Sequence, residues 1–397
     1  MRRTTGRTAA GSVATACVAL GLVAAGAPPA AAQSDPPALP VVSDGCVGPS
    51  PVTASERMSW PLARLSPYQA WQLSRGAGVV VAVLDSGVSA TATGLTGAVL
   101  PGRDVVSGGG ARADCLGRGT AMAGIVAGRD RPGGTVFGMA PEATILPIRV
   151  INDQRRITGR ALADGIDAAL TGGADIVVLG TGDLADSRHL RAAVTRATNM
   201  DVLVVAPVND RAPAVAGQPP PAWFPAAYPE VLAIGGVDLD GRATERPAKD
   251  GGPDVLAPGV GAVVPGPEGP GVYAVGGPAV AAAYAAGTAA LVRAYHPDLT
   301  AEQVRDRLLA TAERPPGAAV GTVDPYSAVA AIDPEGAARI VRHGVAPVVV
   351  PVAVPPDDAL ARARLVTAAI VTLTLLVAAL FAVRHGRRRQ RPGPSGH

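Results

Sequence analysis

The sequence predicts an α/β domain built on a mostly parallel sheet, and three observations lead to that fold class. After Trp60, short apolar runs alternate with segments of helical period, which is typical of parallel strands connected by helices. The chain has 397 residues, enough for one large domain and separate segments at its two ends. A long apolar run without charge lies near each end, outside the alternating region.

Apolar runs mark the expected strands, and periodic segments mark the expected helices. The predicted strands are Val79–Leu84, Ala143–Val150, Asp175–Leu179, Val202–Ala206 and Val231–Gly236. Periodic segments at 157–170 and 187–198 are predicted to be helices. Gly277 and Pro278 begin an alanine-rich helix that extends to about Tyr295, because proline is tolerated in a first helical turn. Thr300 and Gln303 form a capping-box pattern that begins one more helix.

The two end segments predict secretion and membrane attachment. In residues 1–32, three arginines precede an apolar stretch that ends in three alanines, as in a secretory signal peptide. Residues 365–383 carry no charge, and their number is close to the roughly 20 needed to cross a bilayer as a helix. Residues 384–397 form a tail with five arginines, which predicts that this end is cytoplasmic. Together the ends predict a single-pass type I membrane protein with its domain on the extracytoplasmic side.

The segments between these ends differ in composition. Residues 33–55 are rich in proline, serine and small residues, and we expect an extended N-terminal arm there. Residues 56–335 hold the predicted domain, in which we find no internal repeat. Residues 336–364 include a Pro- and Val-rich stretch and are predicted to be a stiff linker to the membrane helix.

The charge of the chain is concentrated at its ends. The formal net charge is +3, but eight arginines lie in the predicted signal peptide and tail, so the part between them is net acidic. Binding of nucleic acid requires a basic face. The composition therefore argues against a nucleic-acid partner.

Cys46 and Cys115 are the two cysteines outside the predicted signal peptide. In an extracytoplasmic domain an even number of cysteines indicates a disulfide. This bridge would close a loop of about 70 residues, which the chain-entropy account values at about 4 kcal/mol of stability. It would also pin the N-terminal arm across the domain, although the spacing alone does not decide whether the two cysteines pair.

Five segments, taken in order, resemble the subtilisin-like serine proteases (S8 family). They resemble the family's aspartate segment, its histidine segment, two of its core strands and its serine helix. These segments are 75–88, 117–127, 138–150, 225–236 and 277–292. With its two end segments, the chain is more narrowly similar to the mycosins, membrane-anchored members associated with type VII secretion in high-GC Gram-positive bacteria. The resemblance covers about residues 56–335 and implies a subtilisin-like three-layer fold.

The resemblance assigns the three catalytic positions of the family to Asp85, Arg118 and Ala279. In the family a serine oxygen attacks, a histidine takes its proton and an aspartate orients the histidine. Asp85 supplies the carboxylate, but a guanidinium accepts no proton and a methyl group is not a nucleophile. In a subtilisin, loss of the base or the nucleophile lowers kcat on the order of 10⁶-fold. We expect no intact triad, and we expect Arg118 and Asp85 to form an ion pair.

Other residues do not replace the missing groups in the sequence pattern. Ser86 lies in a turn, and we find no base that would activate it. None of the five histidines has the setting of the family's histidine: three lie at a helix start, at a helix end and near the linker, and two lie on the tail. They are His189, His296, His343, His385 and His397.

Two further segments resemble parts of the family's cleft. Asn209 matches the oxyanion asparagine, whose amide stabilises negative charge in the transition state, although it can equally be a loop asparagine that binds local backbone. Leu179, Gly180, Thr181 and Gly182 match the segment that pairs with substrate. An open edge there would accept an extended peptide by strand addition, and an ordinary edge strand with a glycine turn is the alternative.

These patterns predict a membrane-anchored pseudoprotease that acts as a scaffold or partner-binding component of a type VII secretion membrane complex. We find no pattern for a cofactor or a metal. One alternative is an active serine endopeptidase that cleaves secreted proteins with unorthodox residues. The other is a module that binds extended peptide segments in its cleft.

Overall fold

In the computed structural model the described residues are 35–42, 45–53, 59–129, 138–151, 157–209, 219–246 and 251–331, with short helical stretches between 367 and 379. The chain divides into two compact units, Met1–Arg339 and Ile340–His397. The first unit contains both hydrophobic core clusters of the described residues. It therefore has a complete core of its own.

The described part of the first unit is organised around a seven-stranded sheet in the order β2-β3-β1-β4-β5-β6-β7. All neighbouring strands in this sheet are parallel. The strands are β1 (Val80–Asp85), β2 (Arg103–Asp104), β3 (Thr144–Arg149), β4 (Ile176–Leu179), β5 (Leu203–Pro207), β6 (Leu232–Val237) and β7 (Val255–Pro258). The predicted parallel sheet is confirmed, and each of the five predicted strands is present.

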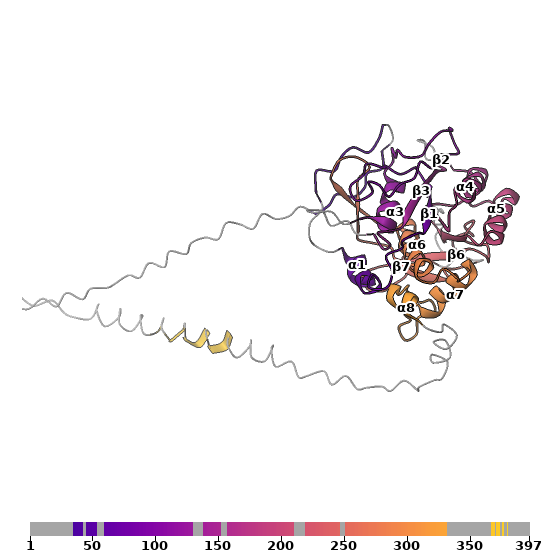
Figure 1. Cartoon of the computed structure of the whole chain (residues 1–397). Coiled ribbons are helices and arrows are strands. Elements are labelled where there is room, and N and C mark those ends of the chain that lie inside the picture. The colour runs from indigo at the N-terminus through magenta and orange to yellow at the C-terminus, as the bar shows by residue number, and fades with distance from the viewer. Residues whose placement is uncertain are drawn as a thin grey trace, which may run out of the picture. The chain divides into compact units, whose positions relative to one another are not determined.

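Helices cover both faces of the sheet and give the three layers (Figure 1). On one face lie α3 (Arg118–Ala127) and α6 (Pro278–Tyr295), whose apolar residues belong to the same core cluster. On the other face lie α4 (Gly159–Thr171) and α5 (Arg188–Asn199), which belong to the second cluster. Strands buried on both faces explain why their sequences are nearly continuous apolar runs rather than alternating ones.

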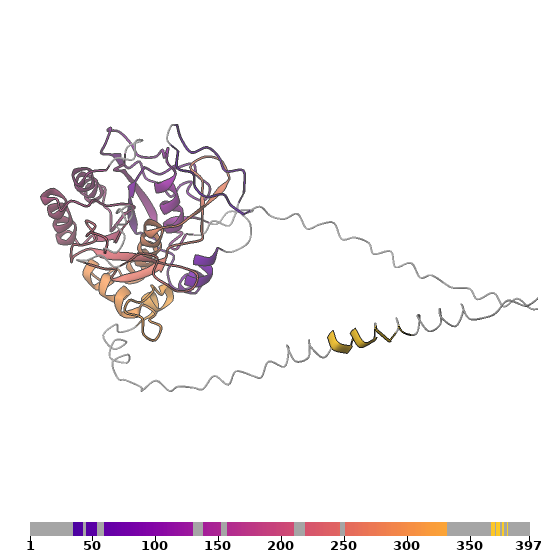
Figure 2. The ribbon, with the colours of Figure 1, turned by 180° about the vertical axis from the view of Figure 1, so that it is seen from behind.

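Capping residues fix where the predicted helices begin. The side chains of Thr158 and Ser187 each accept a hydrogen bond from the first turn of the helix that follows. The predicted capping box is confirmed, because Thr300 and Gln303 bind each other's backbone at the start of α7 (Ala301–Thr311). Helix α8 (Pro325–Ala330) follows, and α6, α7 and α8 lie next to one another in both views of the ribbon (Figure 2).

A few short elements were not predicted from the sequence. They are the strands β2 and β7, the helices α1 (Trp60–Leu65), α2 (Pro67–Ala70) and α8, and the antiparallel pair β8 (Ala262–Pro265) and β9 (Val272–Val275). The segment around β8 and β9 contains many glycines and prolines, which hide short strands in a sequence pattern. This hairpin matters for function because it packs against α3 and precedes α6 directly.

Several predicted segments lie wholly or mostly outside the described residues. They are the signal peptide 1–32, the linker 336–364, the membrane helix 365–383 and the tail 384–397. Among the residues that the structure describes, no helix has both the length and the apolar character needed to cross a membrane.

Candidate functional site

The candidate site lies at the carboxyl ends of the parallel strands, where open α/β sheets bind their ligands. Asp85 is the last residue of β1, Arg118 is the first residue of α3 and Ala279 is the second residue of α6. All three line one cavity of about 280 Å³. The structure therefore brings together the three positions that the sequence singled out.

Arg118 is bound to Asp85 and to the backbone of the neighbouring strand end. Its Nε and Nη2 atoms lie 3.3 and 3.2 Å from the two carboxylate oxygens of Asp85. Nη2 also donates to the carbonyl oxygen of Gly180 at 2.9 Å. The Asp85 side chain is fully buried, whereas 20% of the Arg118 side chain is exposed. The predicted ion pair is confirmed, and it has the two-point geometry that arginine makes with carboxylates.

Glycines at three positions allow this close approach. A Cβ atom on Gly180 would lie 1.9 Å from Oδ2 of Asp85 and 2.6 Å from the sulfur of Met122. A Cβ atom on Gly119 would lie 1.9 Å from the carbonyl oxygen of Gly87. Gly117 immediately precedes α3 and has a φ of 75°, a backbone conformation that residues other than glycine rarely adopt. The two glycines that flank Arg118 at the start of α3 are therefore required by the backbone around them.

Asp114 is a site residue that the sequence analysis missed. Its carboxylate is buried and accepts hydrogen bonds from the hydroxyls of Ser86 and Thr120. It also accepts from the backbone N–H groups of Leu116, Gly117 and Thr120. Burial raises the pKa of Asp114, and the hydrogen bonds from Thr120 and Ser86 oppose that rise. An acidic residue just ahead of a helix start was the only sequence signal for this role.

Ala279 lies in the first turn of α6. Gly277 precedes the helix with a φ of 110°, and Pro278 occupies the first helical position. Ala279 is half-buried and packs against the core cluster that contains α3 and α6. At this corner of the cavity the chain therefore offers a methyl group, and at Arg118 it offers a cation that accepts no proton.

The segment 179–182 is not an open strand edge. Strand β4 lies between β1 and β5 in the sheet, and all four residues are buried. The carbonyl of Gly180 is bound by Arg118, and Asp183 pairs with Phe224 through two backbone hydrogen bonds of 2.8 Å. The expectation of an edge strand is therefore wrong for β4, which ends at Leu179, whereas binding of an extended peptide at residues 180–182 stays a prediction.

Asn209 lies two residues beyond the carboxyl end of β5, and Asp85 lies at the carboxyl end of β1. Asn209 is half-buried. It is not among the residues that line the cavity with Asp85, Arg118 and Ala279. Its assignment as an oxyanion residue stays a prediction.

The remaining candidates for a nucleophile or base lie elsewhere or are already bound. The Ser86 hydroxyl is buried and donates to Asp114 at 2.8 Å. His296 ends α6, about 25 Å along the helix from Ala279 by the rise per residue, and its Nε2 contacts the carbonyl of Val329. His189 is exposed on α5, and the other histidines lie outside the described residues.

The predicted disulfide is confirmed. Cys46 and Cys115 are bonded, with a sequence separation of 69 residues and a Cα–Cα distance of 4.4 Å. The bridge attaches the N-terminal arm to the loop that leads into α3. Arg118 follows three residues after Cys115, so the arm is anchored next to the candidate site.

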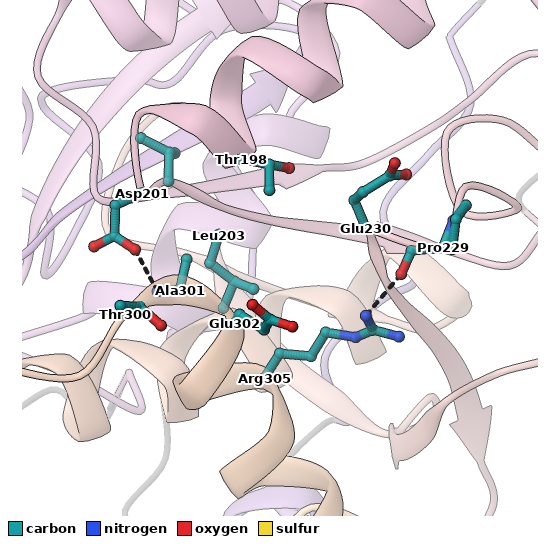
Figure 3. Close-up of a pocket in the computed structure, with 10 residues that line it drawn as sticks. Thr198, Asp201, Leu203, Pro229, Glu230, Thr300, Ala301, Glu302 and Arg305 are labelled. Atoms are coloured by element: carbon teal, nitrogen blue, oxygen red, sulfur yellow. Dashed lines mark hydrogen bonds between the residues drawn. The ribbon is translucent and has the colours of Figure 1, made fainter.

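A second cavity, of about 400 Å³, lies at the opposite end of β5 (Figure 3). In Figure 3 Arg305 extends toward Pro229, whose carbonyl accepts from Nη1 at 2.7 Å, and Asp201 accepts from the backbone of Ala301 at 2.6 Å. This cavity begins where β5 begins, at the end of the sheet opposite the carboxyl ends of the strands. Within the described ranges, no group of three or more histidine, cysteine or acidic side chains is arranged to hold a metal.

The three layers, the parallel sheet and the site at its carboxyl end define a subtilisin-like domain. The family profile described as Peptidase_S8, Subtilase family, matches residues 76–343. The chain therefore belongs to the subtilase family.

Individual relatives give the same placement. Subtilisin DY of Bacillus licheniformis is 33% identical over 252 residues, covering 64% of this chain and 89% of the relative. Mycosin-4 of Mycobacterium tuberculosis (strain ATCC 25618 / H37Rv) is 30% identical over 379 residues, covering 83% of this chain and 81% of the relative. A solved structure described as the serine protease MycP1, an essential component of the type VII (ESX-1) secretion system, superposes with a TM-score of 0.64. It is 26% identical, and the match covers 75% of this chain and 96% of that one.

Proposed function

We propose that this protein is a membrane-anchored mycosin-like pseudoprotease, a subtilase that does not hydrolyse peptides. The observation that carries the proposal is the two-point ion pair between Arg118 and Asp85. If Asp85 stands at the family's aspartate position, the partner that it orients is a permanent cation. A permanent cation cannot remove a proton from a nucleophile, and Ala279 supplies no nucleophile.

The remaining role would be that of a scaffold or partner-binding component of a type VII secretion membrane complex. Similarity to MycP1, which is described as an essential component of such a system, supports this part of the proposal. The Cys46–Cys115 disulfide supports an extracytoplasmic position, since disulfides persist in oxidising compartments. Anchoring by residues 365–383 rests on their apolar sequence.

The test is an activity assay on residues 33–356, which contain the complete core of the first unit. The protein is incubated with unstructured casein and, separately, with a fluorophosphonate probe that reacts only with an activated serine. The double variant Arg118→His, Ala279→Ser serves as the matched comparison. We expect neither cleavage nor labelling by the natural sequence. Casein cleavage or labelling by a preparation free of contaminating protease would instead support the active serine endopeptidase.

A further inference from the structure

The N-terminal arm extends the β8–β9 hairpin by backbone pairing. The N–H of Ala274 in β9 donates to the carbonyl of Pro37 at 2.8 Å, and the carbonyl of Ala274 accepts from the N–H of Leu39 at 3.0 Å. Farther along, the N–H of Val272 donates to the carbonyl of Val52 at 2.8 Å. The outer edge of β9 is therefore occupied by a segment of the same chain.

The same arm forms one wall of the candidate site. Residues 38–41 line the cavity that Asp85, Arg118 and Ala279 line from the other side. Leu39 is half-buried, and a Cβ atom on Gly117 would lie 3.0 Å from its Cδ1 atom. The rest of the cavity wall is mostly apolar. The arm thus places an aliphatic side chain in the wall of a mostly apolar cavity beside the ion pair.

The two halves of the arm are held very differently. Residues 45–53 are fixed by the disulfide, by Val47, which is 1% exposed, and by the hydroxyl of Tyr273, which donates to Gly48 at 2.9 Å. Residues 35–42 have no buried residue, and Val41 is 79% exposed. They are held by two backbone hydrogen bonds and by the packing of Leu39 and Val42 against the core. Breaking those few contacts would open the first half while the second half stayed in place.

The segment 180–183 already has two of its residues bound within the domain. The carbonyl of Gly180 is bound by Arg118, and Asp183 pairs with Phe224. The outer edge of β9 instead presents both the N–H and the carbonyl of Ala274 to whichever extended segment lies there. Strand addition to such an edge supplies affinity through the backbone, and a side-chain cavity supplies selectivity.

We propose that the edge of β9 and the adjoining cavity are a docking groove for an extended aliphatic segment of a partner protein, and that residues 35–42 occupy it until that segment displaces them. The inference rests on the proposed function, because it assigns the partner-binding role to a groove in which no cleavage occurs. The bound arm defines the chemistry of the partner: an extended, uncharged segment, tolerant of proline, with one leucine-sized side chain that packs at the cavity wall where Leu39 lies.

The experiment measures binding of a labelled peptide with the arm's own sequence, residues 35–42, by fluorescence anisotropy. The full chain in detergent is compared with Leu39→Asp, which removes the apolar contact of Leu39, and with Leu239→Asp, the same change at an exposed leucine outside the groove. We expect Leu39→Asp to bind the peptide at least about tenfold more tightly than the natural chain, and Leu239→Asp to match the natural chain. Adding Ala274→Pro, which deletes the edge donor without touching the β8 pairing, should remove the gain. Equal affinity of the natural chain and Leu39→Asp would overturn the proposal.

Hydrogen exchange on the unmutated chain gives a second reading that needs no variant. With the peptide at saturation, residues 35–42 should lose protection while the amide of Ala274 keeps it. Protection of residues 35–42 that is unchanged by saturating peptide contradicts displacement. Mass spectrometry of the recovered peptide separates the two proposals: a cleaved peptide would sink the pseudoprotease, whereas an intact peptide that fails to displace the arm would sink only the groove.

Discussion

At the scale of single residues, the ion pair of Arg118 and Asp85 determines the character of the site. A fully buried carboxylate needs a compensating charge, because transfer of an isolated charge from water is strongly unfavourable. Positive charge at a helix N-terminus is itself unfavourable by about 0.3–1 kcal/mol. The attraction to Asp85 and the bond to the Gly180 carbonyl offset that cost.

Replacing Arg118 by methionine should therefore destabilise the domain. We expect a loss of about 3 kcal/mol in the free energy of unfolding, because removing one partner leaves the buried charge uncompensated. The double variant Arg118→Met, Asp85→Asn should regain most of this loss. The exposed pair Arg160–Asp164 is the control, and Arg160→Met should cost less than about 0.5 kcal/mol. Urea unfolding of the four proteins checks this, and equal losses at the two arginines would contradict it.

Gly180 should tolerate no side chain. A Cβ atom there would overlap the Asp85 carboxylate and the Met122 sulfur. Gly180→Ala should lower stability by about 1–3 kcal/mol, the usual cost of overpacking. Gly252 has no atom within 4 Å of its Cβ position, so Gly252→Ala is the matched control and should have little effect. Thermal unfolding followed by circular dichroism compares the two, and an unchanged melting temperature for Gly180→Ala would exclude the overlap.

At the scale of elements, the short strand β2 is fixed by its last residue, Asp104. Burial raises the pKa of this carboxyl, but hydrogen bonds from Ser107 and Val106 and the charge of Arg149 outweigh that effect, and the net pKa is lowered. A lowered pKa in the folded protein means that Asp104 stabilises the fold above its ordinary pKa of 3.8. That contribution is lost as the pH falls through the folded-state pKa.

The variant Asp104→Asn should accordingly show a pH-dependent cost. We expect it to be less stable than the natural sequence at pH 7, and we expect the difference to shrink below pH 3.8 as the carboxyl of the natural sequence becomes protonated. Urea unfolding at neutral and acid pH measures both differences. A difference that does not change with pH would show that the charge of Asp104 contributes nothing.

The disulfide acts on the N-terminal arm as an element. Replacing Cys46 and Cys115 together by serine should lower stability by about 4 kcal/mol in the chain-entropy account, because the bridge closes a loop of about 70 residues. Calorimetry of the serine double variant beside the natural sequence measures this loss. Reducing the natural sequence should reproduce it, and a reduced protein that melts like the oxidised one would contradict the assignment.

At the scale of the whole molecule, stability is unevenly distributed. All residues of α6 from Val280 to Val292 are buried, and this helix packs against strands β1, β4, β5, β6 and β7 and against helices α3, α7 and α8. The arm residues 35–42 are exposed or half-buried. We therefore expect the amides of α6 to exchange through global unfolding, and the amides of residues 35–42 to exchange through local unfolding of the arm.

Hydrogen exchange with mass spectrometry should resolve these two regimes. We expect the amides of Val280–Val292 to exchange only at the rate of global unfolding, and the amide of Leu39 to exchange much faster under the same conditions. Addition of moderate urea should accelerate the first group and leave the second nearly unchanged. Equal protection of Leu39 and α6 would mean that the arm belongs to the core and does not open by itself.

Much of the fold was predictable because its strands are buried on both faces. Runs such as Val79–Leu84 and Val202–Ala206 are therefore continuous, and glycine or proline follows within a few residues. The hairpin β8–β9 was not predictable, since its strands of four residues lie among prolines and glycines. The ion pair at Asp85 followed from motif positions. Four of the five bonds to Asp114 come from residues within six positions, so an acidic residue ahead of a helix start was a local signal that was overlooked. The pairing of Leu39 with Ala274 joins residues far apart in the chain and leaves no local pattern.

The Cys46–Cys115 bond also determines how strongly any competitor must bind. It keeps residues 35–42 tethered a few residues from Arg118, so the arm competes for the groove at an effective concentration on the order of millimolar. A free peptide at micromolar concentration would rarely displace such a tethered competitor. A successful partner must therefore be concentrated near the domain or hold it through a second contact, and occupancy of the groove would then report assembly with that partner.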